Sequence, residues 1–167
     1  MQLQVSLAIL FFLLMASVFV SPCAEYTTAL SKSSSDFTLT ASGQAHDRFH
    51  QEQIDVALLV MGTADGKYTT VINLHVKGGD LRVDDDETLS VSRGYGILIQ
   101  HSHYIYLTIT ITSRYGGQIV VWFLRGKTGT LSGNSLPVSL SSSRVILPLQ
   151  DYSNLDNLKL KGTITLD

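Results

Sequence analysis

The chain has 167 residues, and its 12 basic side chains nearly balance its 14 acidic ones, giving a formal net charge of −2. The basic residues form no cluster, so the composition argues against a nucleic-acid-binding protein and against a polybasic segment that binds anionic membranes. The single cysteine, Cys23, lies near the start of the chain. The sequence after it therefore has neither a disulfide nor a thiolate metal site, and we expect a domain held together by its apolar core.

The first segment with a clear pattern is the uncharged apolar stretch 7–20, LAILFFLLMASVFV. It is shorter than the roughly 20 residues that cross a bilayer comfortably, and its length fits the apolar region of a secretory signal peptide. The pattern predicts a signal peptide over residues 1–24, with an uncleaved anchor or a lipid anchor on Cys23 as alternatives. We therefore expect a mature protein without a transmembrane helix, secreted or held at the cell envelope.

Residues 25–35 are rich in Ser and Thr and predict a linker. The remainder, 36–167, has the length of one ordinary domain. Its apolar and polar residues alternate, which is the periodicity of a half-buried β-strand. The clearest example is 103–112 (HYIYLTITIT), where the aliphatic residues share one face and the Tyr and Thr residues share the other.

The same alternation predicts further strands in chain order. They are expected at about 36–43, 54–61, 68–77, 80–84, 88–93, 96–100, 103–112, 118–125, 136–149 (one strand or two) and 158–166. Asp65-Gly66, Gly78-Gly79 and Gly94-Tyr95-Gly96 separate several of these runs and are interpreted as turns. The run 118–125 (QIVVWFLR) is apolar on both faces, which predicts a central strand covered on both sides.

Short connections favour pairing between strands that are neighbours in sequence. The sequence therefore predicts an all-β fold, either a single antiparallel β-sandwich or a meander β-barrel of about nine or ten short strands. The pattern alone does not choose between these two architectures.

Two histidines form the first candidate site. His101 and His103 are two residues apart at the start of an expected strand. Both imidazoles would then point to the same side and could bind one divalent metal ion. The alternative is a pair of hydrogen-bonded histidines at the rim of the sheet, because a metal site normally needs three or more oriented ligands.

Two weaker metal candidates lie elsewhere in the chain. His46 and His50 would share a face if they formed a helical turn, with Asp47 or Glu52 assisting. The acidic run 84–87 lacks the Gly and Glu that an EF-hand loop requires. We interpret it as a solvated hairpin tip, with a loose Ca²⁺ site as the alternative.

Tyrosines form a candidate binding surface. Tyr104 and Tyr106 fall on the face that the alternation marks as exposed, and Tyr115 follows in the next turn. Exposed aromatic rings on a sheet often mark a contact site, and they can stack on sugars. The alternative is packing between Tyr and Thr on adjacent strands, which stabilises a sheet without any ligand.

These observations do not indicate a particular chemical reaction. The domain has no cysteine nucleophile and no nucleophile-elbow motif. We expect an exported protein, more an interaction module than an enzyme, with a structural or interaction role at the cell envelope or outside the cell. Its expected partner is a glycan or an envelope protein rather than nucleic acid. The alternatives are a carbohydrate or small-ligand binding module that uses the tyrosines, and a metal-binding protein that uses the His-x-His pair. No cofactor is expected beyond that divalent metal.

Overall fold

The computed structural model describes residues 34–66, 70–84, 87–112, 119–147 and 154–167. The expected signal peptide, most of the linker and Tyr115 lie outside the described residues. All regular secondary structure in the described part is β. The strands are β1 (Ser34–Asp47), β2 (Glu52–Asp65), β3 (Val71–Val83), β4 (Glu87–Ile99), β5 (Tyr104–Thr112), β6 (Ile119–Thr128), β7 (Ser135–Ile146) and β8 (Asn154–Leu166). No helix that could span a membrane occurs in these ranges.

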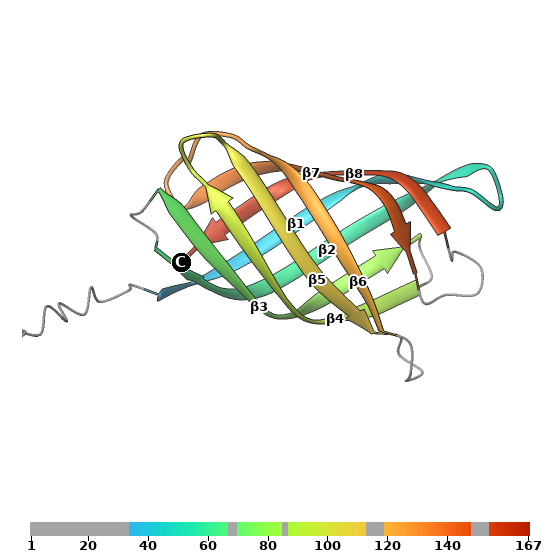
Figure 1. Cartoon of the computed structure of the whole chain (residues 1–167), viewed down its shortest axis with the longest axis horizontal. Helices are drawn as coiled ribbons and strands as arrows, with labels where there is room; N and C mark the ends of the chain where they lie inside the picture. Colours follow the sequence, from blue (N-terminus) through green and yellow to red (C-terminus); the bar gives the residue numbers. More distant parts are fainter. Residues whose placement is uncertain (1–33, 67–69, 85–86, 113–118, 148–153) are drawn as a thin grey trace, which may run out of the picture. The chain divides into compact units, whose positions relative to one another are not determined.

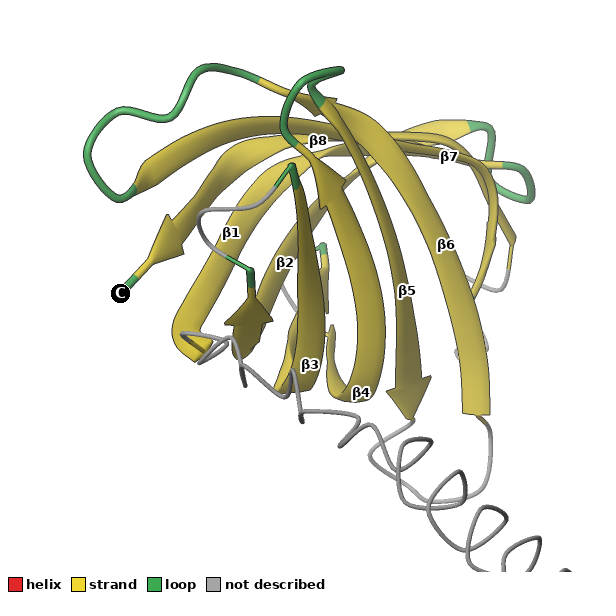
Figure 2. Ribbon diagram, turned by 60° about the vertical axis from the view of Figure 1, so that its left-hand side comes forward, coloured by secondary structure: helices red, strands yellow, loops and turns green. Residues whose placement is uncertain are grey.

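The strands close into one antiparallel barrel. Each strand pairs with the next in sequence, and β8 returns to pair with β1, so the order around the barrel is the order along the chain (Figure 1, Figure 2). The closing ladder runs from the pair Phe37–Leu166 to the pair Asp47–Leu155. The all-β antiparallel prediction is therefore confirmed, and the architecture is a meander barrel of eight strands.

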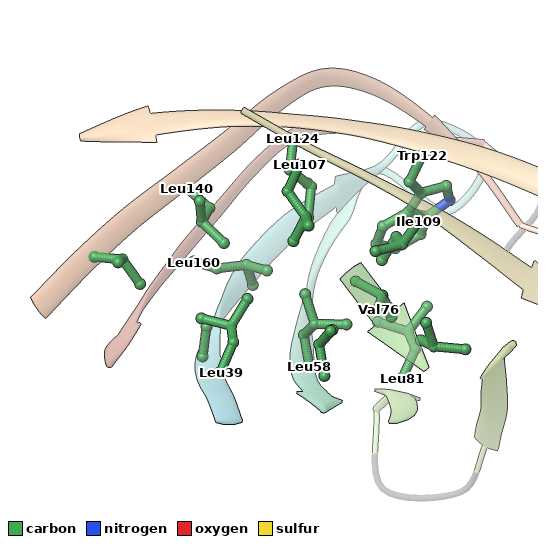
Figure 3. Packing of buried hydrophobic residues seen from close by; sticks show 14 of the residues in the cluster. Leu39, Leu58, Val76, Leu81, Leu107, Ile109, Trp122, Leu124, Leu140 and Leu160 are labelled. Atoms are coloured by element: carbon green, nitrogen blue, oxygen red, sulfur yellow. The ribbon is translucent and has the colours of Figure 1, made fainter. Parts of the chain in front are cut away.

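The barrel interior is filled by apolar side chains. Most inward positions carry Leu, Ile, Val, Ala or an aromatic residue, and Figure 3 shows Leu39, Leu58, Leu107, Leu124 and Leu160 among the side chains that fill the interior. The largest fully buried side chains are Trp122 and Phe37. Burying each large apolar side chain stabilises the fold by about 1.5–3 kcal/mol, so the interior is the main source of stability.

The prediction of nine or ten strands is wrong because Gly78-Gly79 lies inside β3 instead of forming a turn. Val76 and the inward residues before it occupy even positions, whereas Leu81 and Val83 occupy odd ones. The ladder with β2 shifts register at this point, between Met61 and Gly62. A β-bulge inserts one residue and turns every later side chain to the other face.

β4 repeats this arrangement and was likewise predicted as two strands. The ladder with β5 shifts register between Val91 and Arg93, just before Gly94. A Cβ on Gly94 would lie 2.3 Å from the carbonyl oxygen of Thr108, so glycine there allows β4 and β5 to approach closely. A glycine beside a break in alternation indicates a turn in a flat sheet, but it permits a bend in a closed barrel.

The prediction that 118–125 is covered on both faces is also wrong. Val120, Trp122 and Leu124 point inward, but Ile119, Val121 and Phe123 point outward with 66%, 46% and 70% of their surface exposed. A barrel is a single sheet closed on itself, so its outer side is covered only where another element packs on it. No described element packs on this part of β6.

Candidate functional site

The outer surface of the barrel is polar on one side and apolar on another. Outward positions of β8 and β1 carry residues such as Lys159, Lys161, Thr40 and Ser42. Several outward positions of β5 and β6 carry large exposed apolar or aromatic side chains, and the others carry Thr, Arg or Lys. We call this second region the β5–β6 outer face; its residues are Tyr104, Tyr106, Ile119, Val121 and Phe123.

The structure brings together two of the three tyrosines that the sequence indicates. The rings of Tyr104 and Tyr106 stack with centroids 6.5 Å apart and planes 22° apart. Their cross-strand neighbours on β6 are Lys127 and Arg125. The pair thus forms an exposed aromatic platform beside two cations. Tyr115 lies outside the described residues.

The first half of β6 has an unpaired edge. β5 pairs with β6 along its whole length, from Ile119 to Thr128. β7 pairs only with the stretch from Arg125 to Thr128. In the described part of the chain, no strand therefore pairs with the stretch from Ile119 to Leu124 on the side away from β5.

Trp122 links β6 to β7 where their ladder stops. Its indole Nε1–H donates a hydrogen bond of 2.9 Å to the backbone carbonyl of Ile146 at the end of β7. The ring itself is buried inside the barrel. This side chain joins β6 to β7 beyond their ladder, and the buried Trp122 and Leu124 lie on the inner side of the unpaired stretch.

Sequence reasoning missed Ile119, Val121 and Phe123 as surface residues. The signal that points to them is a strand apolar on both faces in a chain that shows no helical segment to cover its outer face. A single-layer barrel with such a strand must expose one of the two apolar rows. Exposed apolar area of this kind makes this face a candidate interaction site.

His101 and His103 lie in the turn between β4 and β5, not on β5, which begins at Tyr104. The backbone of His103 adopts a positive φ of 56°, so the rule that residues two apart on a strand share a face does not apply to the pair. Among the described residues, neither histidine belongs to a cluster of three metal-ligating side chains. A metal site on these histidines stays a prediction supported by two ligands.

A different cluster forms at the turn between β1 and β2. Ligand atoms of Asp47, His50 and Glu52 all lie within 4.8 Å of one another. His46 lies one position earlier on β1, where it faces away from the interior and is not part of this cluster. One imidazole and two carboxylates suit a divalent transition metal.

Hydrogen bonds already hold the buried member of this cluster. Asp47 has no exposed surface. Its Oδ1 accepts the backbone N–H of Phe49 at 2.9 Å, and its Oδ2 is bonded to Nδ1 of His50. Gln51 completes the turn with a positive φ of 58°. These hydrogen bonds explain the buried Asp47 carboxylate as the group that closes a tight turn. A metal ion at this cluster would have to displace the His50 imidazole from Asp47.

This geometry predicts that Asp47 makes stability depend on pH. Burial acts to raise the pKa of the Asp47 carboxyl, but the N–H of Phe49 and the hydrogen bond and charge of His50 lower it below its ordinary value of 3.8. A lowered pKa in the folded state adds stability above the unfolded-state pKa, and this stability is lost as the pH falls through the folded-state value. We expect Asp47→Asn to lower the free energy of unfolding by about 1–2 kcal/mol near neutral pH.

The measurement is urea denaturation of wild type and Asp47→Asn between pH 6 and pH 2. The difference in free energy of unfolding between the two proteins should be constant near pH 6 and shrink as the pH falls below 3.8. Asp55→Asn is the matched control, because Asp55 is exposed on β2. A difference that stayed constant down to pH 2 would contradict this account.

Comparisons of this chain with protein-family models, with curated proteins and with solved structures find no match. The inference of function therefore rests on the barrel and its surfaces.

Proposed function

We propose that this protein is a non-catalytic interaction barrel that acts outside the cytoplasm and associates with a second copy of itself through the edge of β6. The observation that carries the proposal is the unpaired stretch from Ile119 to Leu124, whose outward side chains are exposed and apolar. The apolar segment 7–20 supports export, since its length fits a signal peptide. The most distinctive features of the described surface are apolar, which suits binding better than catalysis.

An unpaired edge provides a row of backbone donors and acceptors that another strand can pair with. Natural proteins usually protect such an edge with Lys, Pro or a covering segment. The stretch from Ile119 to Leu124 contains neither Lys nor Pro nor any charged residue. The edge therefore lacks these sequence features and is suited to pairing with another strand.

A second copy is the partner that this edge fits best. Two identical strands can pair antiparallel about a twofold axis, so that each copy contributes the same surface. The absence of charge between Ile119 and Leu124 means that no like charges would meet across the axis. Pairing would also bring the rows of Val121 and Phe123 in the two copies together, which removes exposed apolar surface from water.

The β5–β6 outer face supplies the rest of the contact. Specific interfaces bury about 1,200–2,000 Å² in total, which takes side chains as well as a backbone ladder. On β5, Tyr106 lies diagonally across from Phe123 and extends the exposed surface, whereas Tyr104 lies farther along the strand, beside Lys127. Aromatic residues are common at the centre of such interfaces.

The experiment is sedimentation equilibrium of the mature chain, wild type and the double variant Val121→Glu/Phe123→Glu. The wild type is expected to be a dimer at micromolar concentration. The variant places carboxylates opposite one another across the twofold axis, so dimerisation should weaken at least 100-fold. Circular dichroism and Trp122 fluorescence check that the barrel remains folded, because both replaced side chains point outward.

The matched control is Thr163→Glu/Thr165→Glu, which has the same spacing on β8, a strand paired on both sides. It should dimerise like the wild type. A wild-type chain that is monomeric at about 100 μM, or a β6 variant that remains a dimer, would exclude the proposal.

The alternative is that the Tyr104–Tyr106 platform binds a glycan. The observation in its favour is the stacked, exposed ring pair. In that case Tyr104→Ala/Tyr106→Ala should abolish retention on an immobilised polysaccharide without lowering the melting temperature, and the β6 variant should bind normally. A loss of stability in the tyrosine variant would instead indicate packing between strands.

A further inference from the structure

A recess lies at the end of the barrel where β6 finishes, at the opposite end of β6 from its unpaired edge. Its volume is about 180 Å³. Inward side chains at the ends of β3, β4, β7 and β8 line it: Ile72, Leu98, Leu136 and Leu166. These four side chains are buried and aliphatic, so the inner wall of the recess is apolar.

The polar residues of the lining are Gln100, His103, Thr128 and Thr130, of which Thr128 is the most buried. Thr128, the last residue of β6, is inward-facing and only 8% exposed, and it lines the recess. Its backbone N–H donates to the carbonyl of His103 at 2.9 Å, which fixes β6 to the turn between β4 and β5. Its side chain lines the recess, so its hydroxyl can form a hydrogen bond with a ligand held there.

The rim of the recess is formed by connecting segments. Residues 129–131, which follow β6, lie on one side with the partly exposed Leu131, and His103 lies on another. The recess is therefore open to solvent but mostly apolar. Water against the inner wall of Ile72, Leu98, Leu136 and Leu166 has few polar partners, so it should be easy to displace.

The volume sets the size of the ligand. An engineered apolar cavity of about 150 Å³ accommodates benzene. A recess of about 180 Å³ therefore fits one six-membered ring with a small substituent. The hydroxyl of Thr128 can both donate and accept a hydrogen bond, so it selects a ring that carries one polar group.

We propose that this end of the barrel is a binding site for a small, mostly apolar molecule with one hydrogen-bonding group, of the size of phenol. The apolar wall provides affinity and Thr128 provides discrimination, which is the usual composition of small-molecule sites. The site does not depend on self-association, because it lies at the other end of β6 from the stretch proposed to pair with a second copy.

The test is titration calorimetry of the mature chain with phenol and with toluene, which has nearly the same shape but no hydrogen-bonding group. We expect phenol to bind with a dissociation constant of about 0.1–1 mM and toluene more weakly. Thr128→Val keeps the side-chain shape and removes the hydroxyl. It should weaken phenol binding about 5–10-fold and leave toluene binding unchanged.

A second variant tests the location of the site without altering the buried wall. Leu131→Arg places a long charged side chain at the rim of the recess and should weaken the binding of both phenol and toluene at least tenfold. Phe49→Arg makes the same kind of change at an exposed residue in the turn between β1 and β2, at the other end of the barrel. It should leave the affinity for both compounds unchanged. The site is excluded if phenol does not bind at about 10 mM, if Leu131→Arg leaves binding unchanged, or if Thr128→Val weakens both compounds equally.

Discussion

Replacing Trp122 with Ala is expected to lower the free energy of unfolding by about 3–5 kcal/mol. The indole is only 2% exposed and faces Ile109 across the β5–β6 ladder, as Figure 3 shows. Removing it leaves a large cavity in a closed barrel whose walls cannot collapse without breaking strand pairs. It also removes the hydrogen bond to the carbonyl of Ile146, which links β6 to β7 beyond their ladder.

Urea denaturation followed by circular dichroism measures this effect, because Trp122 is the only tryptophan and its fluorescence is lost in the variant. Trp122→Phe keeps most of the ring and loses the indole N–H, so it should fall between wild type and Trp122→Ala. Phe49→Ala is the control; its side chain is 74% exposed, and we expect a change within about 0.5 kcal/mol. A Trp122→Ala protein as stable as this control would show that the indole does not close the barrel.

Replacing Gly162 with Val is expected to prevent closure of the barrel or to cost more than about 4 kcal/mol. Gly162 lies on β8, opposite Ala41 of β1 and Val138 of β7. A Cβ at this position would lie 1.9 Å from the carbonyl oxygen of Thr40 and 2.5 Å from the Cα of Ala41. Both atoms belong to the backbone, so relief requires β8 to move away from β1, the strand pair that closes the barrel.

Thermal unfolding followed by circular dichroism compares this variant with Gly78→Ala. Gly78 also lies inside a strand, but a Cβ there would be 3.8 Å from the nearest atom, the carbonyl oxygen of Val91. This is ordinary contact, so Gly78→Ala should change the free energy of unfolding by about 1 kcal/mol or less. Equal melting temperatures for the two variants would show that the close approach at Gly162 is not required.

The strands with unbroken alternation were predictable from the sequence. The aliphatic row of 103–112 forms the inward row of β5, and Leu158, Leu160, Ile164 and Leu166 face the interior from β8. The period of two is a local property of an extended chain, so it can be identified without knowing what packs against it. The all-β class and the antiparallel order follow from this period and from the short connections.

The candidate binding features could not be predicted from the sequence, because they depend on contacts between residues that are far apart along the chain. Whether Gly78-Gly79 forms a turn or a bend depends on β2, and the exposure of Phe123 depends on how much of β7 pairs with β6. The cluster at Asp47 forms because a tight turn brings Glu52 back beside it, where a helical turn would have joined His46 to His50.

The sequence by itself therefore determined the inward rows of strands with unbroken alternation, such as β5 and β8, because this alternation is a local property of each strand. The tertiary structure alone decided that the sheet closes as a barrel, which apolar row of β6 remains outside it, and that Thr128 lies in an apolar recess. Those features depend on how strands bend and where a ladder stops, and these are set by contacts between segments far apart along the chain.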